Sequence, residues 1–306
     1  MPPLIHRQVL EGAEPGPRLL VTAGVHGDEF EPMVAVSRLA DTFDAKRLRG
    51  RLTLIPIANR SAYARASRTG EDDLDLARTF PGKSTGSITE RVAAALKDEI
   101  RAADYYIDLH TGGTRLDVLP LVGYMLTKDE NVLGWQRRMA EAFNLPIVWG
   151  TSAELEGRSL SAARDAGVPA IYAEHGGGGG FRADAVEDYM VGCEQVMVEL
   201  GMIDAERAPR RVRHRVEDRR NNSGYLQICH PAPADGLFLP QVRLSDRVQV
   251  GQPIGLVMNP DDKERHSVLA EQSGLVITLH TFPQVQRGTG LCVVLEIPPS
   301  TGKPYE

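Results

Sequence analysis

Short apolar runs that alternate with segments of helical spacing dominate the first two thirds of this chain. Four such runs lie at residues 18–25, 51–58, 104–109 and 168–173, and each is followed by polar residues. Strands that alternate with helices form a mostly parallel sheet, and such a sheet is buried on both faces. We therefore expect an α/β fold with a mostly parallel sheet and helices on both faces.

Segments with helical spacing occur at residues 31–43, 86–103 and 187–203. The second of them begins with a capping pattern, in which Ser87 or Thr89 precedes an amphipathic stretch. We expect all three segments to be helices that cover the sheet.

Polar residues with chemically useful side chains follow the four apolar runs. They are His26, Asn59, His110 and Glu174. Ligands bind such sheets outside the carboxyl ends of the strands. We therefore expect these four side chains to gather at one edge of the sheet, and we take that edge as the candidate site.

The length of 306 residues exceeds the roughly 250–300 residues at which single cores stop growing, so two domains are expected. Residues 1–204 carry the strand and helix alternation, whereas residues 223–306 show short alternating strands with Pro and Gly turns. Residues 205–222 are basic and polar, and we expect a linker there. Their mixed charges are typical of a solvated connector rather than of a nucleic-acid patch.

The C-terminal segment contains two similar halves, residues 235–255 and 273–291, each with a Gly, an apolar run, a Gln-Val step and a second Gly. This pattern predicts a small all-β module of two pseudo-repeated hairpins. The module resembles a lipoyl/biotinyl-type fold. Lys263 lies between the halves, so a modified carrier lysine is one alternative and an exposed loop lysine is the other.

The net charge, the lengths of the apolar runs and the first residues restrict the kinds of protein that this chain is expected to be. A net charge of -6 argues against a nucleic-acid binder, which would carry a basic face. No apolar run approaches the roughly 18–20 residues that span a bilayer. Residues 1–12 lack the basic start and apolar core of a signal peptide. We expect a cytoplasmic protein without a disulfide framework, since its three cysteines are far apart.

A metal site is the strongest chemical hypothesis for the sheet edge. His26 and Glu29 form an H-x-x-E pair that offers an imidazole nitrogen and a carboxylate oxygen from one turn. A catalytic zinc site uses three protein ligands and a water, and His110 is the best third candidate. Asp108 would point to the same side of its strand and support a ligand. The alternative is that His110 is a hydrogen-bonded core histidine.

Glu174 and the arginines supply groups that a metal hydrolase needs. Glu174 ends a buried strand and precedes the glycine run 176–180, which we expect to be a mobile loop beside the site. Such a glutamate accepts a proton from water and returns it to a leaving amine. Arg68 and Arg78 lie between the ligands, where arginines stabilise an oxyanion or bind a carboxylate. Each is alternatively a solvated surface residue.

Several motifs in one order carry a family resemblance. The sequences "GVHGDE", "DLDLARTFPG", "GSITER", "DYYIDLHTGG" and "GVPAIYAEHGG" follow one another between about residues 18 and 200. In this the chain resembles the succinylglutamate desuccinylase/aspartoacylase family, a branch of the zinc-carboxypeptidase-like hydrolases.

The resemblance implies one zinc ion per chain and the hydrolysis of an N-acyl amino acid. It implies that Glu174 acts as general base or acid, that Arg68 polarises the scissile carbonyl and that Arg78 binds the substrate carboxylate. The metal ligands that it implies are His26, Glu29 and His110. The partner is then a small N-acylated molecule, with no nucleic acid and no membrane involved.

One position departs from the family pattern. The family typically has D-L-N-R before F-P-G, whereas this chain has Ala77 between Leu76 and Arg78. Alanine donates no side-chain hydrogen bond, so the recognition of an α-carboxylate loses a partner worth about 1.5–3 kcal/mol. Asn59 is a candidate replacement. We expect a preference for an unusual amide or for one outside the α-amino acids.

Three alternatives stay open on the sequence alone. One is a carboxypeptidase-like peptidase acting on short peptides, and another is a catalytically silent binding protein. The third is a carrier protein built around the β-module. The same ligand types also accept Mn²⁺, Co²⁺ or Fe²⁺. The sequence leaves the oligomeric state open, including a homo-oligomer.

Overall fold

The computed structural model describes residues 4–297 except 222, 225–228 and 262. The chain divides into two compact units. The first contains residues up to 114 and residues 120–223, and the second contains residues 115–119 and those from 224 onward. Strand β5 (Leu116–Met125) therefore begins in the second unit and ends in the first.

The first unit is built around a mixed sheet with the strand order β1-β3-β2-β4-β7-β5-β6-β8. Strands β3, β2, β4 and β7 are parallel in successive pairs, and β1 is antiparallel to β3. The four apolar runs of the sequence are the strands of this parallel part. The strands other than β5 are β1 (Gln8–Glu11), β2 (Glu14–Thr22), β3 (Arg49–Ile55), β4 (Tyr105–His110), β6 (Ile147–Thr151), β7 (Ala170–Gly177) and β8 (His214–Glu217).

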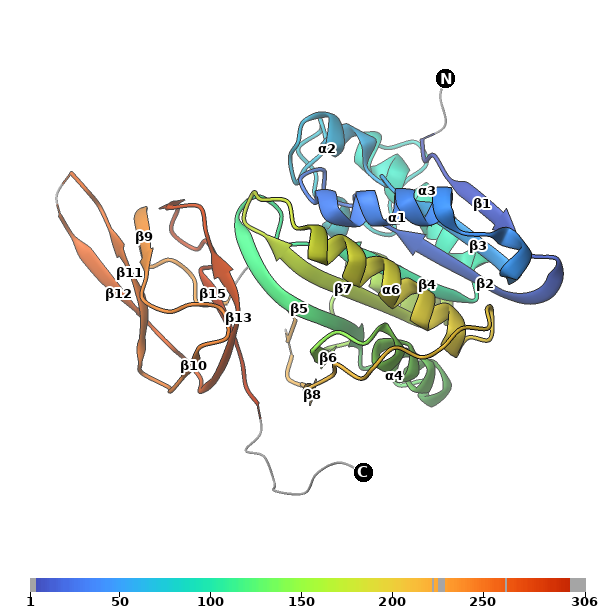
Figure 1. The fold of residues 1–306 in the computed structure, drawn as a ribbon. Helices are drawn as coiled ribbons and strands as arrows, with labels where there is room; N and C mark the ends of the chain where they lie inside the picture. The colour runs from blue at the N-terminus through green and yellow to red at the C-terminus, as the bar shows by residue number, and fades with distance from the viewer. Residues whose placement is uncertain (1–3, 222, 225–228, 262, 298–306) are drawn as a thin grey trace. The chain divides into compact units, whose positions relative to one another are not determined.

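Two groups of helices cover this sheet (Figure 1). Helices α1 (Phe30–Thr42) and α4 (Glu130–Phe143) both pack against α6 (Ala183–Glu199), and α3 (Ile88–Ala102) packs against α5 (Ser159–Ala166). The predicted α/β sheet with helices is confirmed. The shorter helical turns are η1 (Ala45–Arg47), α2 (Arg60–Ala64) and η2 (Leu76–Arg78).

The alternation of side chains along the strands assigns a face to each helix group. Leu19, Ile107 and Ile171 share one core cluster with residues of α1, α4 and α6. Asp108 points to the opposite face, where Ser159 at the start of α5 donates a hydrogen bond to it. Side chains that follow the register of Asp108 therefore lie on the side of α5.

The second unit contains two antiparallel sheets around its own core. One has the order β12-β11-β9-β14, and the other consists of residues 116–118 of β5 together with β10, β13 and β15. Their bounds are β9 (Gly236–Pro240), β10 (Arg247–Val248), β11 (Pro253–Met258), β12 (Arg265–Leu269), β13 (Gly274–His280), β14 (Gln284–Val285) and β15 (Cys292–Leu295).

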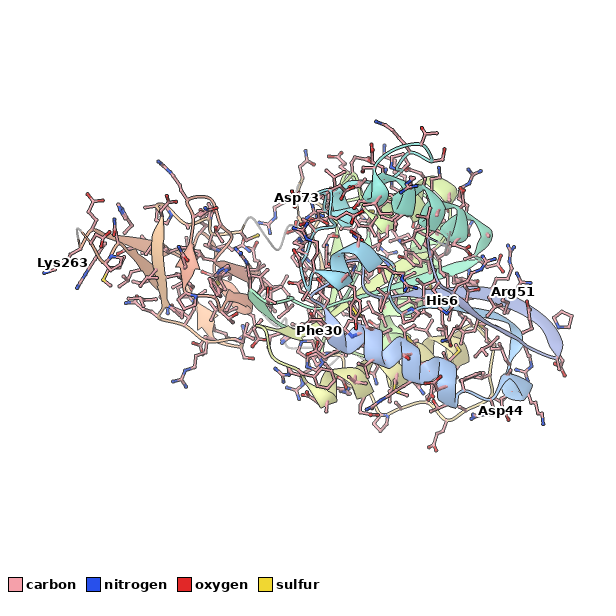
Figure 2. The ribbon with its side chains drawn as sticks, turned by 90° about the horizontal axis from the view of Figure 1, so that it is seen from above. His6, Phe30, Asp44, Arg51, Asp73 and Lys263 are labelled. Atoms are coloured by element: carbon pink, nitrogen blue, oxygen red, sulfur yellow. The ribbon has the colours of Figure 1, made fainter. Side chains whose placement is uncertain are left out.

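The two similar halves of the sequence exchange their short strands in the second unit. Strand β10 of the first half pairs with β13 of the second, and β14 of the second pairs with β9 of the first. Lys263 lies exposed in the turn between β11 and β12, with a φ of 64° (Figure 2). Its modification stays an alternative.

Part of the segment 205–222, where we expected a linker, belongs to the first sheet. Within it β8 pairs in parallel with β6 and extends the first sheet. The basic side chains are also bound, because Arg211 pairs with Asp188 and Arg215 pairs with Glu141. Among the described residues, no helix combines the length and the apolar character that a bilayer crossing requires.

Two helix glycines allow the packing of α6 on α4 to be tested. A Cβ on Gly192 of α6 would lie 2.5 Å from the Phe143 ring, whereas a Cβ on Gly134 of α4 would meet nothing within 4 Å. We expect Gly192→Ala to lower the free energy of unfolding by about 1–3 kcal/mol through overpacking. Gly134→Ala should raise it by about 0.5–1 kcal/mol through helix propensity. Urea denaturation measures both, and equal effects of the two changes would contradict this packing.

Candidate active site

The site residues come from loops and strand ends at one edge of the first sheet. His26 and Glu29 lie in the loop between β2 and α1, and His110 is the last residue of β4. In the parallel pair of β4 and β7, Glu174 is the direct partner of His110. The register of two parallel strands therefore places the predicted general base beside the predicted third ligand.

His26, Glu29 and His110 form a buried cluster around one carboxylate. Glu29 Oε1 lies 2.6 Å from His26 Nδ1, and Glu29 Oε2 lies 2.9 Å from His110 Nδ1. One ligand atom from each residue lies within 4.8 Å of the others. The exposed fractions are only 3%, 1% and 9%, so this cluster of polar groups is shielded from water.

The outer nitrogens of both histidines face carboxylates. His110 Nε2 lies 3.1 Å from Asp108 Oδ2, and His26 Nε2 lies 3.1 Å from Asp75 Oδ1. A carboxylate on the outer nitrogen fixes the orientation and the tautomer of a metal-binding imidazole. Both Nδ1 atoms are thus left to face the centre of the cluster.

Asp75 is the site residue that sequence reasoning missed. Its Oδ2 accepts a hydrogen bond of 2.9 Å from Arg68 Nε, and Arg68 Nη1 lies 3.5 Å from His26 Nδ1. The sequence signal was an aspartate just before the helical turn Leu76–Arg78, a position typical of an N-cap. Asp75 does cap this turn, because its Oδ1 accepts a hydrogen bond from Ala77 N. Asp75 is also the first residue of the D-L-N-R pattern that the family has here, which was the second available signal.

Local packing explains why glycine follows His26. A Cβ on Gly27 would lie 2.0 Å from the backbone carbon of Ala62, so only glycine allows the ligand loop to lie against α2. Asn59 caps the same helix, since its Oδ1 accepts a hydrogen bond of 3.1 Å from Ala62 N. Asn59 is fully buried, and its Nδ2 has no hydrogen-bond partner among the described residues.

The charges of the cluster stabilise one another against the cost of burial. Burial alone would raise the pKa of Glu29, but His26 and His110 outweigh it and hold this pKa well below its ordinary value. Burial alone would lower the pKa of His110, but Asp108 and Glu29 raise it well above its ordinary value. Glu29 is therefore ionised at neutral pH, as a metal ligand must be.

For Glu174, the effect of burial on the pKa outweighs the effect of the nearby positive charges. Burial raises the pKa of Glu174 to about 8, with Glu29 and Asp108 adding to the rise while His110 and Arg68 oppose it. Its Oε2 is buried without a hydrogen-bond partner among the described residues. A carboxyl group that exchanges its proton near neutral pH suits general acid and base chemistry.

The remaining predicted residues lie around this centre. Arg78 is exposed in η2, where its Nη1 donates a hydrogen bond of 2.7 Å to Ala77 O, and its charge also lowers the pKa of Asp75. The glycine loop lies beside the end of β4, because Gly112 N donates to Gly176 O and Gly179 N donates to Gly113 O.

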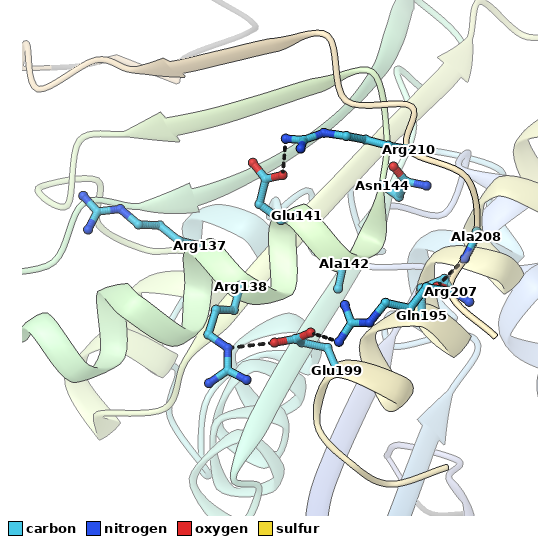
Figure 3. A pocket seen from close by; sticks show the side chains of 10 residues that line it. All are labelled: Arg137, Arg138, Glu141, Ala142, Asn144, Gln195, Glu199, Arg207, Ala208 and Arg210. Carbon is cyan, nitrogen blue, oxygen red and sulfur yellow. Dashed lines mark hydrogen bonds and ion pairs between the residues drawn. The ribbon is translucent and has the colours of Figure 1, made fainter. Parts of the chain in front are cut away.

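A separate cavity of about 490 Å³ lies over α4 and α6 and contains none of these site residues (Figure 3). Its guanidinium groups are engaged by carboxylates. Glu199 binds both Arg138 and Arg207, and Glu141 binds Arg210. These ion pairs attach the basic segment to the helices, which accounts for its composition.

The donor set of the cluster suits a divalent transition metal. Two imidazole nitrogens and one carboxylate are the ligand types of a catalytic zinc site with an open position. The carboxylates behind both histidines add the outer contacts that such sites use. His26, Glu29 and His110 therefore fit a metal ion by atom type, by proximity and by charge.

Known proteins resemble this chain in sequence and in fold. A model of the succinylglutamate desuccinylase/aspartoacylase catalytic domain matches residues 15–200. The chain belongs to this family. It is also 30% identical over 297 residues to the N-alpha-acetyl-L-2,4-diaminobutyric acid deacetylase of Halomonas elongata, which covers 94% of this chain and 84% of that protein.

Solved structures of the family share the fold over nearly the whole chain. A succinylglutamate desuccinylase/aspartoacylase from Rhodobacter sphaeroides has a TM-score of 0.86 at 26% identity, covering 97% of this chain and 90% of that one. The product-bound ectoine utilization protein EutE (DoeB) from Ruegeria pomeroyi has a TM-score of 0.86 at 28% identity, covering 94% and 87%. This family member is a hydrolase that acts on amide bonds.

The raised pKa of Glu174 predicts a pH-dependent effect on stability. The folded protein retains a proton that the unfolded chain releases above pH 4.5, so ionised Glu174 costs stability as the pH rises toward about 8. In metal-free protein, the Tm of Glu174→Gln minus the Tm of wild type should increase between pH 4.5 and about pH 8 and then stay constant. The change Glu71→Gln in an exposed loop is the control, and a constant difference at Glu174 would contradict the raised pKa.

Proposed function

We propose that this protein is a zinc-dependent amidohydrolase that removes the acyl group from an N-acyl amino acid or a related small amide. The single observation that supports this most is the buried cluster of His26, Glu29 and His110 with Glu174 directly beside it in the strand register. The donor set and the family support zinc as the metal. The substrate is a small N-acylated molecule.

The metal would be held by His26, Glu29 and His110. When bound, zinc supplies a Lewis acid for the amide carbonyl and lowers the pKa of water. Glu29 brings the negative charge to this site, and the two histidines bring neutral donors. The carboxylates on their outer nitrogens keep both Nδ1 atoms directed inward.

Glu174 would move the proton. As a carboxylate it accepts a proton from the attacking water, and as a carboxylic acid it donates that proton to the nitrogen of the leaving amine. The C–N bond breaks, the acyl carbon gains the oxygen of water, and the products are a carboxylate and a free amine. A pKa near 8 keeps both forms of Glu174 accessible at neutral pH.

The two arginines would bind negative charge. Arg68 is fixed by Asp75 with its Nη1 near the ligand cluster, where it stabilises the developing oxyanion. Arg78 follows the same turn and is exposed, as a group that binds a substrate carboxylate must be. Asn59 is a weaker candidate for substrate binding, because its oxygen is committed to the cap of α2.

The relatives support the substrate class. A relative named for N-alpha-acetyl-L-2,4-diaminobutyric acid deacetylation aligns over nearly the whole chain. An N-acetylated diamino acid is therefore the first substrate to test. A carboxypeptidase-like peptidase acting on short peptides is the second candidate, favoured by the exposed Arg78, which would bind a C-terminal carboxylate.

The direct test measures amine release from N-acetyl and N-succinyl amino acids, N-acetylated diamines and dipeptides. We expect release from N-acetyl amino acids, loss of release after treatment with a chelator, and recovery on addition of Zn²⁺. Faster cleavage of dipeptides would favour the peptidase. Silence across the panel in protein that holds one metal per chain would contradict the proposed substrate class.

Two variants separate the metal site from proton transfer in the same assay. His110→Ala should lose bound metal and turnover together, because it removes a ligand. Glu174→Gln should keep the metal and lose about 10²–10⁴-fold in kcat. Turnover retained in the Glu174 variant would remove the general-base role, and metal retained in the His110 variant would remove that ligand.

The alanine at position 77 leads us to expect weak binding of substrate α-carboxylates. Its backbone N–H binds Asp75, and a change of side chain leaves that bond in place. Ala77→Asn adds an amide donor beside Arg78 and should lower KM for substrates with an α-carboxylate by about tenfold or more. N-acetylated amines without a carboxylate serve as the internal control. An unchanged substrate profile would contradict a role for this position in specificity.

A further inference from the structure

One buried hydroxyl contacts the backbone of the candidate site from the α6 side of the sheet. Tyr189 lies on α6, and its exposed fraction is 0%. Its hydroxyl donates a hydrogen bond of 2.5 Å to His110 O and lies 3.3 Å from His175 O. His110 ends β4, and His175 directly follows Glu174 in β7. One side chain therefore contacts both strands that present the predicted third ligand and the proton-transfer group.

The surroundings of Tyr189 fix it against β7. Tyr189 belongs to the core cluster that α6 shares with the sheet, and α6 packs on β7 (Figure 1). The His175 ring lies edge-on to the Tyr189 ring, with centroids 6.5 Å apart at an angle of 66°. His175 Nδ1 also lies 3.2 Å from Asp188 Oδ2, and Asp188 pairs with Arg211. The residue next to Tyr189 on α6 is thus held by partners of its own.

Packing alone does not explain the hydroxyl of Tyr189. Phenylalanine would fill the same space in the core without a polar atom. A buried hydroxyl costs free energy unless it is hydrogen-bonded, so a buried tyrosine needs a partner. Tyr189 has its partner at His110, in the last register pair between β4 and β7.

This pair lies where both strands end. Beyond it the chains turn through glycines of positive φ, 61° at Gly113 and 77° at Gly176. The ends of a strand ladder open more easily than its centre. His110 and Glu174 are the members of this last pair. A contact that bridges the two strands here therefore limits opening at the residues that the site uses.

We propose that Tyr189 is a positioning residue, whose hydroxyl connects the ends of β4 and β7 and thereby fixes the spacing between His110 and Glu174. The inference rests on the proposed function but goes beyond it, because it assigns part of the site geometry to a helix on the opposite face of the sheet. Proton transfer needs groups within hydrogen-bond distance of the reacting atoms. The spacing should therefore affect turnover more than substrate binding.

Two tyrosine substitutions separate this role from a general loss of stability. Tyr189→Phe removes the hydroxyl and keeps the ring. The matched control is Tyr124→Phe on β5, because Tyr124 is 3% exposed and its hydroxyl donates a hydrogen bond of 2.8 Å to Glu217 Oε1. Each variant loses one buried hydrogen bond, so both should unfold at a lower Tm than wild type. Only Tyr189→Phe loses a contact with the backbone of a site residue.

The first readout is amide hydrogen exchange in metal-free protein without substrate. We expect the amides of residues 110–113 and 174–177 to exchange about 3–10-fold faster in Tyr189→Phe than in wild type, because the strand ends lose one hydrogen bond. Tyr124→Phe should leave the exchange of these amides unchanged. Equal exchange in Tyr189→Phe and wild type would contradict the connection between the strands.

The second readout separates kcat from KM at saturating Zn²⁺. We expect Tyr189→Phe to lower kcat by about 10–100-fold, while KM and Zn²⁺ affinity stay close to wild type. Incorporation of 4-aminophenylalanine at position 189 returns an N–H donor and should restore most of kcat. Tyr124→Phe should keep the kcat of wild type.

Two results of this assay would overturn the inference. If kcat is the same in Tyr189→Phe and Tyr124→Phe, the hydroxyl serves only the core. If Zn²⁺ binding weakens in Tyr189→Phe but kcat at saturating Zn²⁺ is unchanged, the hydroxyl acts on His110 alone and not on its spacing from Glu174.

These outcomes are distinct from a failure of the proposed function. Wild-type protein that releases no amine would contradict the proposed function, and the role of Tyr189 in turnover would fall with it. Wild-type protein that releases amine, with a Tyr189→Phe variant of equal kcat, would contradict only the role of Tyr189.

Discussion

The rest of the site depends on one buried carboxylate. Glu29 is 1% exposed and stays ionised because an imidazole faces each of its oxygens. A charge at this depth is tolerated only when it is paired and hydrogen-bonded. Each histidine in turn contacts an aspartate on its outer side. Asp75 lies behind His26 and accepts a hydrogen bond from Arg68. Asp108 lies behind His110 and accepts a hydrogen bond from the Thr22 hydroxyl.

The sheet supplies the geometry that these charges need. Parallel strands bring Thr22, Asp108, His110 and Glu174 to one face through the β2–β4 and β4–β7 registers. A shift of one residue in either register would turn one partner to the other face. The loop residues His26 and Glu29 are fixed separately, by the close approach of Gly27 to α2. The site therefore combines strands of fixed register with one tightly packed loop.

The sequence predicted the parts of the site that follow from strand ends. His26, His110 and Glu174 were identified because each follows an apolar run, and the carboxyl ends of parallel strands share one edge of the sheet. Asp75 was missed because its partners are distant in the sequence and its local pattern is that of a cap. Strand β8 was missed because it has few apolar residues. Arg215 of this strand pairs with a carboxylate on α4, and Arg211 just before the strand pairs with one on α6, and only the fold brings these groups together.

The division of β5 between the two units has a consequence for the architecture of this chain. Residues 116–118 pair with β13, while residues from 121 onward pair with β6. No single cut in the polypeptide separates the units, because one of them is assembled from two distant pieces of chain. A chain ended after residue 222 would keep 116–118 as a strand edge without β13, and an open edge invites pairing between molecules. The C-terminal unit therefore needs residues 115–119, which the N-terminal part of the chain supplies, to complete one of its sheets.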